Sequence, residues 1–222
     1  MSYRRPPLVM ALGSYGGYYA FGEVMREVDP EASENGIVYF VEHLSRGPLD
    51  WLGLRVKGIK LKRVKEGMQL ERGNIYLQPG VYDVYERRGS ILVLDPDSDG
   101  DAPRFVMAKP HEKYMGLSHS ISSALEAGYL SDMMIVALSG GGRDGSDALE
   151  EITGLRERGA ENGGVPHIVI QDWDTAEVSE IPVLMCRKAR ELRLPHLVLR
   201  PGDIGREINR FLSPSSSAST LR

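Results

Sequence analysis

The sequence predicts an α/β protein with a doubly wound, mostly parallel sheet flanked by helices. Apolar runs of strand length occur at residues 7–12, 36–41, 133–138, 167–170 and 197–199. They are continuous rather than alternating, which is typical of strands buried on both faces of a parallel sheet. Helix-like segments separate most of these runs, and strands joined in this way form right-handed crossovers around a shared sheet.

The helices are expected in a fixed order relative to these strands. Amphipathic segments at residues 21–28, 118–130, 146–159, 181–194 and 202–212 predict five helices. Pro182 fits the first turn of the fourth helix, where the missing N–H costs little. Asp203 is a candidate cap for the last helix, because a short polar side chain can accept a hydrogen bond from the first turn.

The middle of the chain has a different pattern. Around residues 75–108 the apolar runs are short and are separated by the turn signals "QPG", "RRGS" and "PDSDGD". This predicts a small antiparallel hairpin inserted beside the main sheet. Residues 1–213 are therefore expected to form one domain, and the serine-rich residues 214–222 a disordered tail.

Composition excludes several classes of protein. The 222 residues carry a net charge of −4 with a pI of about 5.8, which argues against a nucleic-acid binder. A single cysteine, Cys186, cannot form an internal disulfide and fits a reducing cytoplasm. No apolar run is long enough to span a membrane, and no motif predicts a metal or cofactor site.

Three reactive side chains follow three of the predicted strands. Ser14 follows the first strand within "GSYGG", His43 follows the second, and Asp144 lies in the glycine-rich loop "SGGGRDG" after the third. Parallel strands of an open α/β sheet place their carboxyl ends, and with them the binding site, at one edge. A serine needs a histidine to accept its proton, and the histidine needs a carboxylate to hold its tautomer. The sequence therefore predicts a Ser-His-Asp triad.

Simpler roles exist for each of these residues. A serine in a glycine-rich turn is most often a helix cap or a phosphate contact, and a histidine that ends a strand is most often structural. The glycine-rich loop alone is typical of a flexible turn or of a loop that cradles a phosphate. The chain order Ser14, His43, Asp144 and the presence of Leu12 in place of a motif glycine both disfavour an ordinary α/β-hydrolase.

Several separated stretches together resemble the catalytic domain of the chemotaxis protein-glutamate methylesterases (CheB type). "LGSYGG" is similar to the family's Gly-Ala-Ser-Thr-Gly-Gly turn, "VEHLSRGP" to its Gln-His-Met-Pro, and "LSGGGRDG" to its Thr-Gly-Met-Gly-x-Asp-Gly. "YLQPG" resembles Tyr-Ile-Ala-Pro-Gly, and the stretch "VIQDWDTAEVSEIP" resembles the family's Ala-Gln-(Asp/Asn)-Glu-Ala segment and the Gly-Met-Pro after it. These stretches occur in the family's order over most of the chain.

The resemblance implies a function. It implies a serine esterase that hydrolyses glutamate γ-methyl esters on the cytoplasmic helices of methyl-accepting chemoreceptors, with deamidation of glutamine as a second activity. The triad would be Ser14, His43 and Asp144, with backbone N–H groups of Tyr15 and Gly141 as oxyanion donors. No cofactor and no metal are implied. The family's receiver domain has no counterpart in this sequence, so a separate response-regulator protein is a further candidate partner.

Four positions depart from the family pattern. Leu12 replaces a glycine, Tyr15 a threonine, Gly141 a methionine and Asp83 a histidine. Two other hypotheses therefore stay open beside the methylesterase: a non-catalytic binding module of a chemosensory system, and an esterase with a different substrate. A nucleotide-binding domain ranks last, because the chain lacks a Walker lysine and a full G-x-G-x-x-G.

Overall fold

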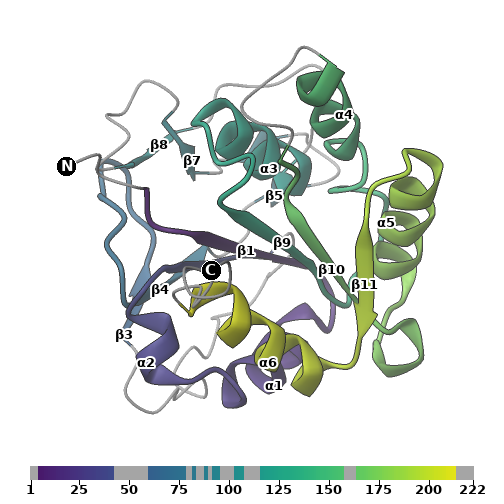
Figure 1. Cartoon of the computed structure of the whole chain (residues 1–222), viewed down its shortest axis with the longest axis horizontal. Coiled ribbons are helices and arrows are strands. Elements are labelled where there is room, and N and C mark those ends of the chain that lie inside the picture. Colours follow the sequence, from purple (N-terminus) through teal and green to yellow (C-terminus); the bar gives the residue numbers. More distant parts are fainter. Residues whose placement is uncertain are drawn as a thin grey trace, which may run out of the picture.

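The predicted fold class is confirmed by a computed structural model that describes residues 5–42, 60–78, 82–83, 88–89, 92–95, 103–107, 116–157 and 164–213. Its main feature is a seven-stranded parallel sheet in the order β11-β10-β9-β1-β2-β4-β3, with helices on both faces (Figure 1). The strands are β1 (Leu8–Gly13), β2 (Ile37–Glu42), β3 (Lys60–Arg63), β4 (Asn74–Gln78), β9 (Met133–Ala137), β10 (His167–Gln171) and β11 (His196–Leu199).

The central strand β1 is the point where the winding reverses. Leu8 pairs with Ile37 of β2 on one side and with Met133 of β9 on the other. The chain adds β2, β3 and β4 on the first side of β1, where their order outward is β2, β4, β3, and later adds β9, β10 and β11 outward on the second. Such a reversal leaves a crevice at the carboxyl ends of the two strands that flank it. The residues that follow β1 and β9 therefore lie at the expected binding position.

Helices cover the two faces of the sheet in two groups. α1 (Gly17–Arg26), α2 (Pro30–Ser33) and α6 (Pro201–Leu212) lie on one face, and α3 (Gly116–Glu126), α4 (Leu149–Glu157) and α5 (Glu180–Glu191) on the other (Figure 1). The alternation of side chains along β1 explains both cores. Met10 and Leu12 pack toward α3, α4 and α5, whereas Val9 and Ala11 pack toward α1 and α6.

The sheet is wider than the sequence predicted. Residues 75–78, which we expected to open the antiparallel insertion, belong to the parallel strand β4, which pairs with β2 and β3. All five residues of β4 are buried, so its environment is that of an inner strand. Antiparallel pairing joins β5 (Tyr82–Asp83) to β6 (Arg88–Gly89) and β7 (Leu92–Leu94) to β8 (Phe105–Met107), and an isolated bridge joins Gln69 to Arg104.

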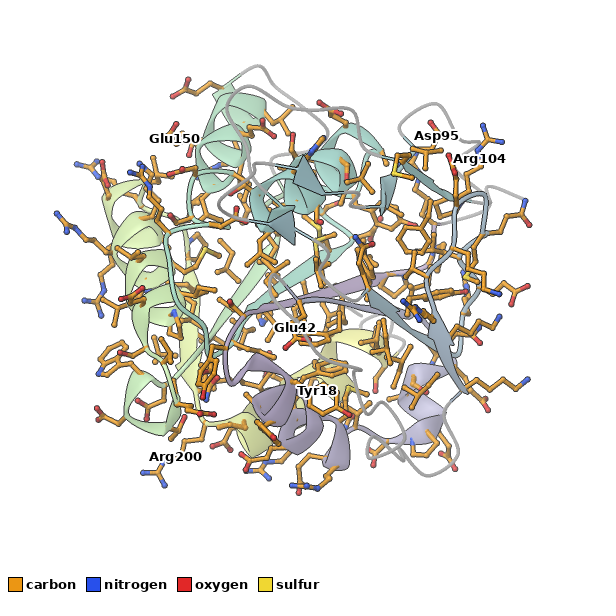
Figure 2. The ribbon with its side chains drawn as sticks, turned by 180° about the vertical axis from the view of Figure 1, so that it is seen from behind. Tyr18, Glu42, Asp95, Arg104, Glu150 and Arg200 are labelled. Atoms are coloured by element: carbon orange, nitrogen blue, oxygen red, sulfur yellow. The ribbon has the colours of Figure 1, made fainter. Side chains whose placement is uncertain are left out.

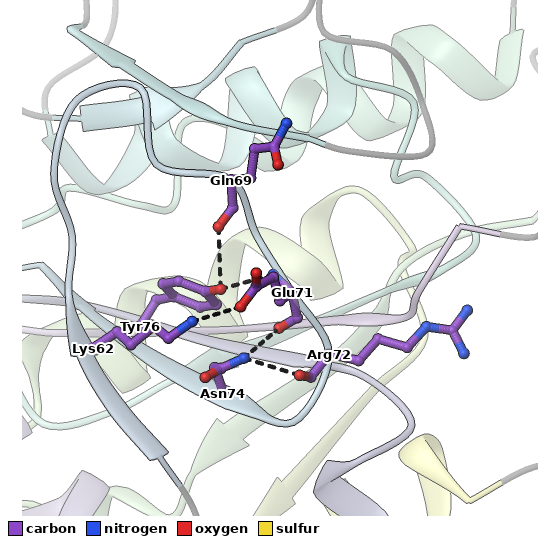
Figure 3. A network of polar contacts seen from close by, with 6 residues as sticks. All are labelled: Lys62, Gln69, Glu71, Arg72, Asn74 and Tyr76. Atoms are coloured by element: carbon purple, nitrogen blue, oxygen red, sulfur yellow. Dashed lines mark hydrogen bonds and ion pairs between the residues drawn. The ribbon is translucent and has the colours of Figure 1, made fainter.

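Strand β3 was not predicted because its sequence, KLKR, is highly charged. It is the edge strand, where lysine side chains discourage pairing with other chains. The segment between β3 and β4 is held by a polar network (Figure 3). The Tyr76 hydroxyl accepts the Glu71 N–H at 2.7 Å, Asn74 Nδ2 donates to the carbonyls of Glu71 and Arg72, and Lys62 pairs with Glu71 at 2.6 Å.

The start of α6 differs from the sequence prediction as well. Arg200 occupies the N-cap position, Pro201 is the first helical residue, and no side chain caps the helix. Asp203 instead lies in the first turn and bonds Arg206. Pro201 explains the shift, because its fixed φ suits the first helical position. The predicted tail, residues 214–222, lies outside the described residues.

Candidate active site

Ser14 lies in a tight turn directly after β1. Its side chain is 1% exposed, its N–H donates to the Ser139 carbonyl at 3.0 Å, and its carbonyl accepts the Gly17 N–H at 2.7 Å. Its Oγ has no hydrogen-bond partner among the described residues. A buried hydroxyl without a partner costs free energy, so this atom is better suited to chemistry than to holding the turn.

The glycines around Ser14 are required by close packing. A Cβ on Gly13 would lie 2.9 Å from the Gly17 Cα, and one on Gly17 would lie 2.9 Å from the Ser139 carbonyl oxygen. Gly16 has φ 78°, a conformation that favours glycine, and a Cβ there would lie 2.6 Å from Ser139 Oγ. The "GSYGG" turn therefore needs its glycines, because it packs closely against Ser139.

The glycine-rich loop after β9 reaches Ser14. A Cβ on Gly140 would lie 2.7 Å from both the Cβ and the N of Ser14, so only glycine permits this approach. The N–H groups of Tyr15 and Gly141 form no hydrogen bond within the described part of the chain. Tyr15 directly follows Ser14, and Gly141 directly follows Gly140, which approaches Ser14 closely. Two backbone donors of the kind that an oxyanion hole requires therefore belong to residues adjacent to this contact.

Asp144 is 7% exposed and is held by the start of α3. Its Oδ2 accepts the Leu117 N–H at 2.8 Å, and its Oδ1 accepts the Ser118 N–H at 2.9 Å. The Ser118 hydroxyl in turn accepts the Gly145 N–H at 2.8 Å. A helix N-terminus favours negative charge, so this arrangement both orients the carboxylate and suits its charge.

The predicted histidine is the part of the site that the structure leaves open. His43 and the side chain of Asp83 lie outside the described residues. The residue before His43, Glu42, ends β2 and pairs with Gly13, the residue before Ser14. The structure therefore places Ser14, Tyr15, Gly141 and Asp144 and leaves the predicted triad itself as a prediction.

Glu42 is a buried carboxyl group that the sequence analysis did not single out. It is 5% exposed, in the interior of the molecule, and its Oε2 has no hydrogen-bond partner among the described residues (Figure 2). Burial raises the pKa of Glu42 to about 7. A charged residue at the end of an otherwise apolar strand was the signal that could have identified it.

Ser139 and Gln171 form a buried polar connection behind the Ser14 turn. The Ser139 hydroxyl lies 3.0 Å from the Tyr15 carbonyl, to which it donates, and accepts the Val178 N–H at 3.0 Å. The Ser139 N–H donates to Gln171 Oε1 at 2.8 Å, and the Gln171 amide donates to Thr175. These contacts join the ends of β9 and β10 to the turn that carries Ser14. Sequence reasoning missed both residues, since one serine and one glutamine carry no motif of their own.

Two further observations concern metal ligands and membrane-spanning helices. Within the described ranges, no three histidine, cysteine, aspartate or glutamate side chains gather in a way that could hold a metal ion. In that same part of the chain, no helix has both the length and the apolar character needed to cross a bilayer.

Comparison with known proteins gives one family. The model of the family described as CheB methylesterase matches residues 9–208. The crystal structure of the Thermotoga maritima CheB methylesterase catalytic domain is similar in fold, with a TM-score of 0.70 at 16% sequence identity. The similarity covers 93% of this chain and 99% of that one. No curated protein sequence matches the chain.

Proposed function

Because the chain belongs to the CheB methylesterase family, we propose that it is a serine esterase that removes methyl groups from glutamate γ-methyl esters of chemoreceptors. The observation that carries the proposal is the buried Ser14 hydroxyl, which has no partner among the described residues. The N–H groups of Tyr15, the next residue, and of Gly141, next to Gly140, form no hydrogen bond to any described residue. Receptor helices in the cytoplasm are the proposed partner, and glutamine deamidation is a proposed second activity.

In the proposed mechanism, Ser14 Oγ attacks the ester carbonyl carbon while His43 accepts the hydroxyl proton. Asp144, fixed by the N–H groups of Leu117 and Ser118, orients the imidazole and favours its protonated form. The sequence position of His43, directly after the strand residue that pairs with Gly13, supports this role. His43 then gives the proton to the departing methanol, which leaves an acyl-enzyme on Ser14.

The tetrahedral intermediate carries its negative charge on the former carbonyl oxygen. The N–H groups of Tyr15 and Gly141 are the proposed donors to that oxygen, and the nearby N-terminus of α1 adds a favourable dipole. Loss of one such donor typically reduces kcat by about 10²–10³-fold. Water then attacks the acyl-enzyme, with His43 as general base, and restores the Ser14 hydroxyl.

Methanol release from methylated receptor fragments by the wild type and by Ser14→Ala tests the proposal. We expect the Ser14→Ala variant to fall to the background rate while its melting temperature stays near that of the wild type. Ser122→Ala, which removes a buried hydroxyl within α3, is the matched control and should retain activity. A fluorophosphonate probe should label the wild type at Ser14 and leave Ser14→Ala unlabelled.

The same experiment separates the alternative functions. A folded wild type that neither reacts with the probe nor releases methanol would contradict both esterase hypotheses and leave a binding module. Labelling of Ser14 without methanol release would point instead to an esterase with a different substrate. The exposed Tyr15 side chain, 64% accessible beside Ser14, is where such a difference in substrate would arise.

A further inference from the structure

The loop formed by Gly140, Gly141 and Gly142 has no side chain with which to hold its own shape. Glycine samples more backbone conformations than any other residue, so three in succession leave the peptide groups free to rotate. Gly142 itself has φ 94°, which a residue with a side chain rarely adopts. A backbone donor is effective only when its direction is fixed before the reaction. The loop must therefore be held from outside.

The start of α5 supplies the contacts that hold this loop. The Gly140 N–H donates to the Val178 carbonyl at 2.8 Å, and the Ile181 N–H donates to the Gly140 carbonyl at 2.9 Å. The Gly142 N–H donates to Glu180 Oε2 at 2.6 Å. Of the three successive amides, the first and third are thus engaged. The middle one, on Gly141, forms no hydrogen bond within the described part of the chain.

We propose that Glu180 is a positioning residue, whose carboxylate holds the glycine loop so that the Gly141 N–H remains directed out of the loop and available to the substrate. The inference rests on the proposed esterase function and adds a residue to its machinery. Glu180 begins α5, so its backbone is fixed by the helix while its side chain reaches the loop.

Glu180 also occupies a position where a simpler role exists. A carboxylate in the first turn of a helix stabilises that helix through its charge alone. The two roles differ in what they require of the side chain. Holding the loop requires an acceptor oxygen at the end of a chain of this length, whereas the helix effect requires the negative charge. Glutamine keeps the acceptor and removes the charge, and alanine removes both.

The first arm of the test is steady-state kinetics of Glu180→Ala and Glu180→Gln with a methylated receptor fragment. We expect kcat to fall about tenfold in Glu180→Ala with KM unchanged, which is less than the loss of a whole oxyanion donor. Glu180→Gln should stay within about twofold of the wild type. Asp174→Ala removes an exposed carboxylate from η3 (Trp173–Thr175), at the same edge of the sheet, and should leave kcat unchanged.

The second arm is rescue by a substitution in the loop itself. A Cβ on Gly141 would lie 3.7 Å from Glu180 Oε2 and 3.8 Å from Val178 Cγ1, which are ordinary contacts, so Gly141→Ala fits without strain. Alanine restricts the backbone where glycine does not. We therefore expect the double variant Glu180→Ala, Gly141→Ala to regain part of the kcat that Glu180→Ala loses.

The third arm is amide hydrogen exchange over residues 139–142, which does not depend on catalysis. Exchange should accelerate in Glu180→Ala and stay near the wild-type rate in Glu180→Gln. If the wild type shows no esterase activity, the proposed function fails, and the exchange data still decide whether Glu180 holds the loop. Equal kcat and exchange in wild type and Glu180→Ala would overturn the inference, as would a Glu180→Gln variant as impaired as Glu180→Ala.

Discussion

The two edges of the parallel sheet are built from opposite kinds of residues. At the carboxyl edge, each of the five inner strands ends in or is followed by a polar side chain that is at most 5% exposed. These are Ser14, Glu42, Gln78, Ser139 and Gln171. At the amino edge, three of the same strands begin with the fully buried apolar residues Leu8, Ile37 and Met133. Gln78, Ser139 and Gln171 are hydrogen-bonded, whereas Ser14 Oγ and Glu42 Oε2 have no partner among the described residues. Burial of a polar group without a partner is costly, so these two groups are the better candidates for a functional role.

The amino edge nevertheless contains a surface pocket of about 690 Å³. Its lining combines basic residues from the ends of α4 and α5 with the residues that lead into β10 and β11: Arg156, Val165, Arg190, Arg193, Leu194, Pro195 and His196. Arg156 and Arg190 lie in the last turns of α4 and α5, where a positive charge is stabilised by the negative end of the helix dipole. This pocket lies at the edge opposite the candidate site and is therefore not part of it.

Asp144→Asn is a test of the carboxyl edge, and of the substitutions considered it should have the largest effect on kcat. The amide keeps the shape of the carboxylate but cannot hold the histidine in the productive tautomer, so we expect kcat to fall about 10²–10⁴-fold. It also turns a donor toward the N–H group of Leu117 or Ser118, which should lower the melting temperature. Asp147→Asn is the matched control, because Asp147 pairs with Arg143 in the neighbouring turn. Full activity in Asp144→Asn would show that Asp144 only caps α3 and takes no part in catalysis.

Glu42→Gln tests the same edge through pH. The pKa of Glu42 is raised to about 7, so the folded state keeps a proton that the unfolded state loses near pH 4.5. Stability should therefore fall as pH rises from about 4.5 to 7, by about 2–3 kcal/mol at most. Glutamine stays neutral, so the variant should match the wild type at pH 4.5 and exceed it at pH 8. Urea unfolding at both pH values measures the difference. If the free energy of unfolding changed with pH equally in the wild type and in Glu42→Gln, the raised pKa of Glu42 would be contradicted.

Ser139→Ala should have an intermediate effect. It leaves the Val178 N–H and the Tyr15 carbonyl without their partner, which costs about 1–3 kcal/mol for a buried site. Because the turn that carries Ser14 loses this support, kcat should fall together with stability. Denaturant unfolding and esterase kinetics on the same preparations would test the coupling, and loss of stability with unchanged kcat would argue against it.

Arg193→Gly tests the amino edge. It should have the smallest effect of the four substitutions, and it should stabilise the fold rather than destabilise it. Arg193 has φ 54°, and the N–H groups of Arg193 and Leu194 donate to the carbonyls of Arg190 and Ala189. This is a Schellman ending of α5, with arginine where glycine is preferred. Glycine should stabilise the fold by about 0.5–1 kcal/mol and leave kcat unchanged. A thermal melt and an activity assay suffice, and a change in kcat would link the two edges.

The parts of the fold that could be predicted from sequence are those with continuous apolar runs. The strands β1, β2, β9, β10 and β11 and the helices α1, α3, α4, α5 and α6 all lie where their patterns predicted them. β3 was missed because its side chains are charged, and β4 was assigned to the insertion because turn signals follow it closely. Both belong to the sheet through backbone pairing, which side-chain periodicity does not record.

The candidate site divides in the same way. Ser14 and Asp144 stand out in sequence because glycines surround them. The structure gives Gly13, Gly16, Gly17 and Gly140 a packing reason, whereas Gly142 and Gly145 have a positive φ. Ser139, Gln171 and Glu180 do not stand out, because their contacts depend on how the ends of β9 and β10 meet the start of α5. Residues that perform chemistry leave short motifs, whereas residues that support them are identified by three-dimensional contacts.

The glycine turn around Ser14 has a consequence for how this sequence can drift over evolution. Gly13, Gly16 and Gly17 have no room for a Cβ, so replacing any of them would disturb the core whether or not the protein is an enzyme. The Ser14 hydroxyl, by contrast, supports no contact among the described residues. A lineage that lost catalysis would therefore keep its glycines and be free to lose its serine. If Ser14 is the nucleophile, as proposed, we expect its loss among related sequences to mark descendants without esterase activity.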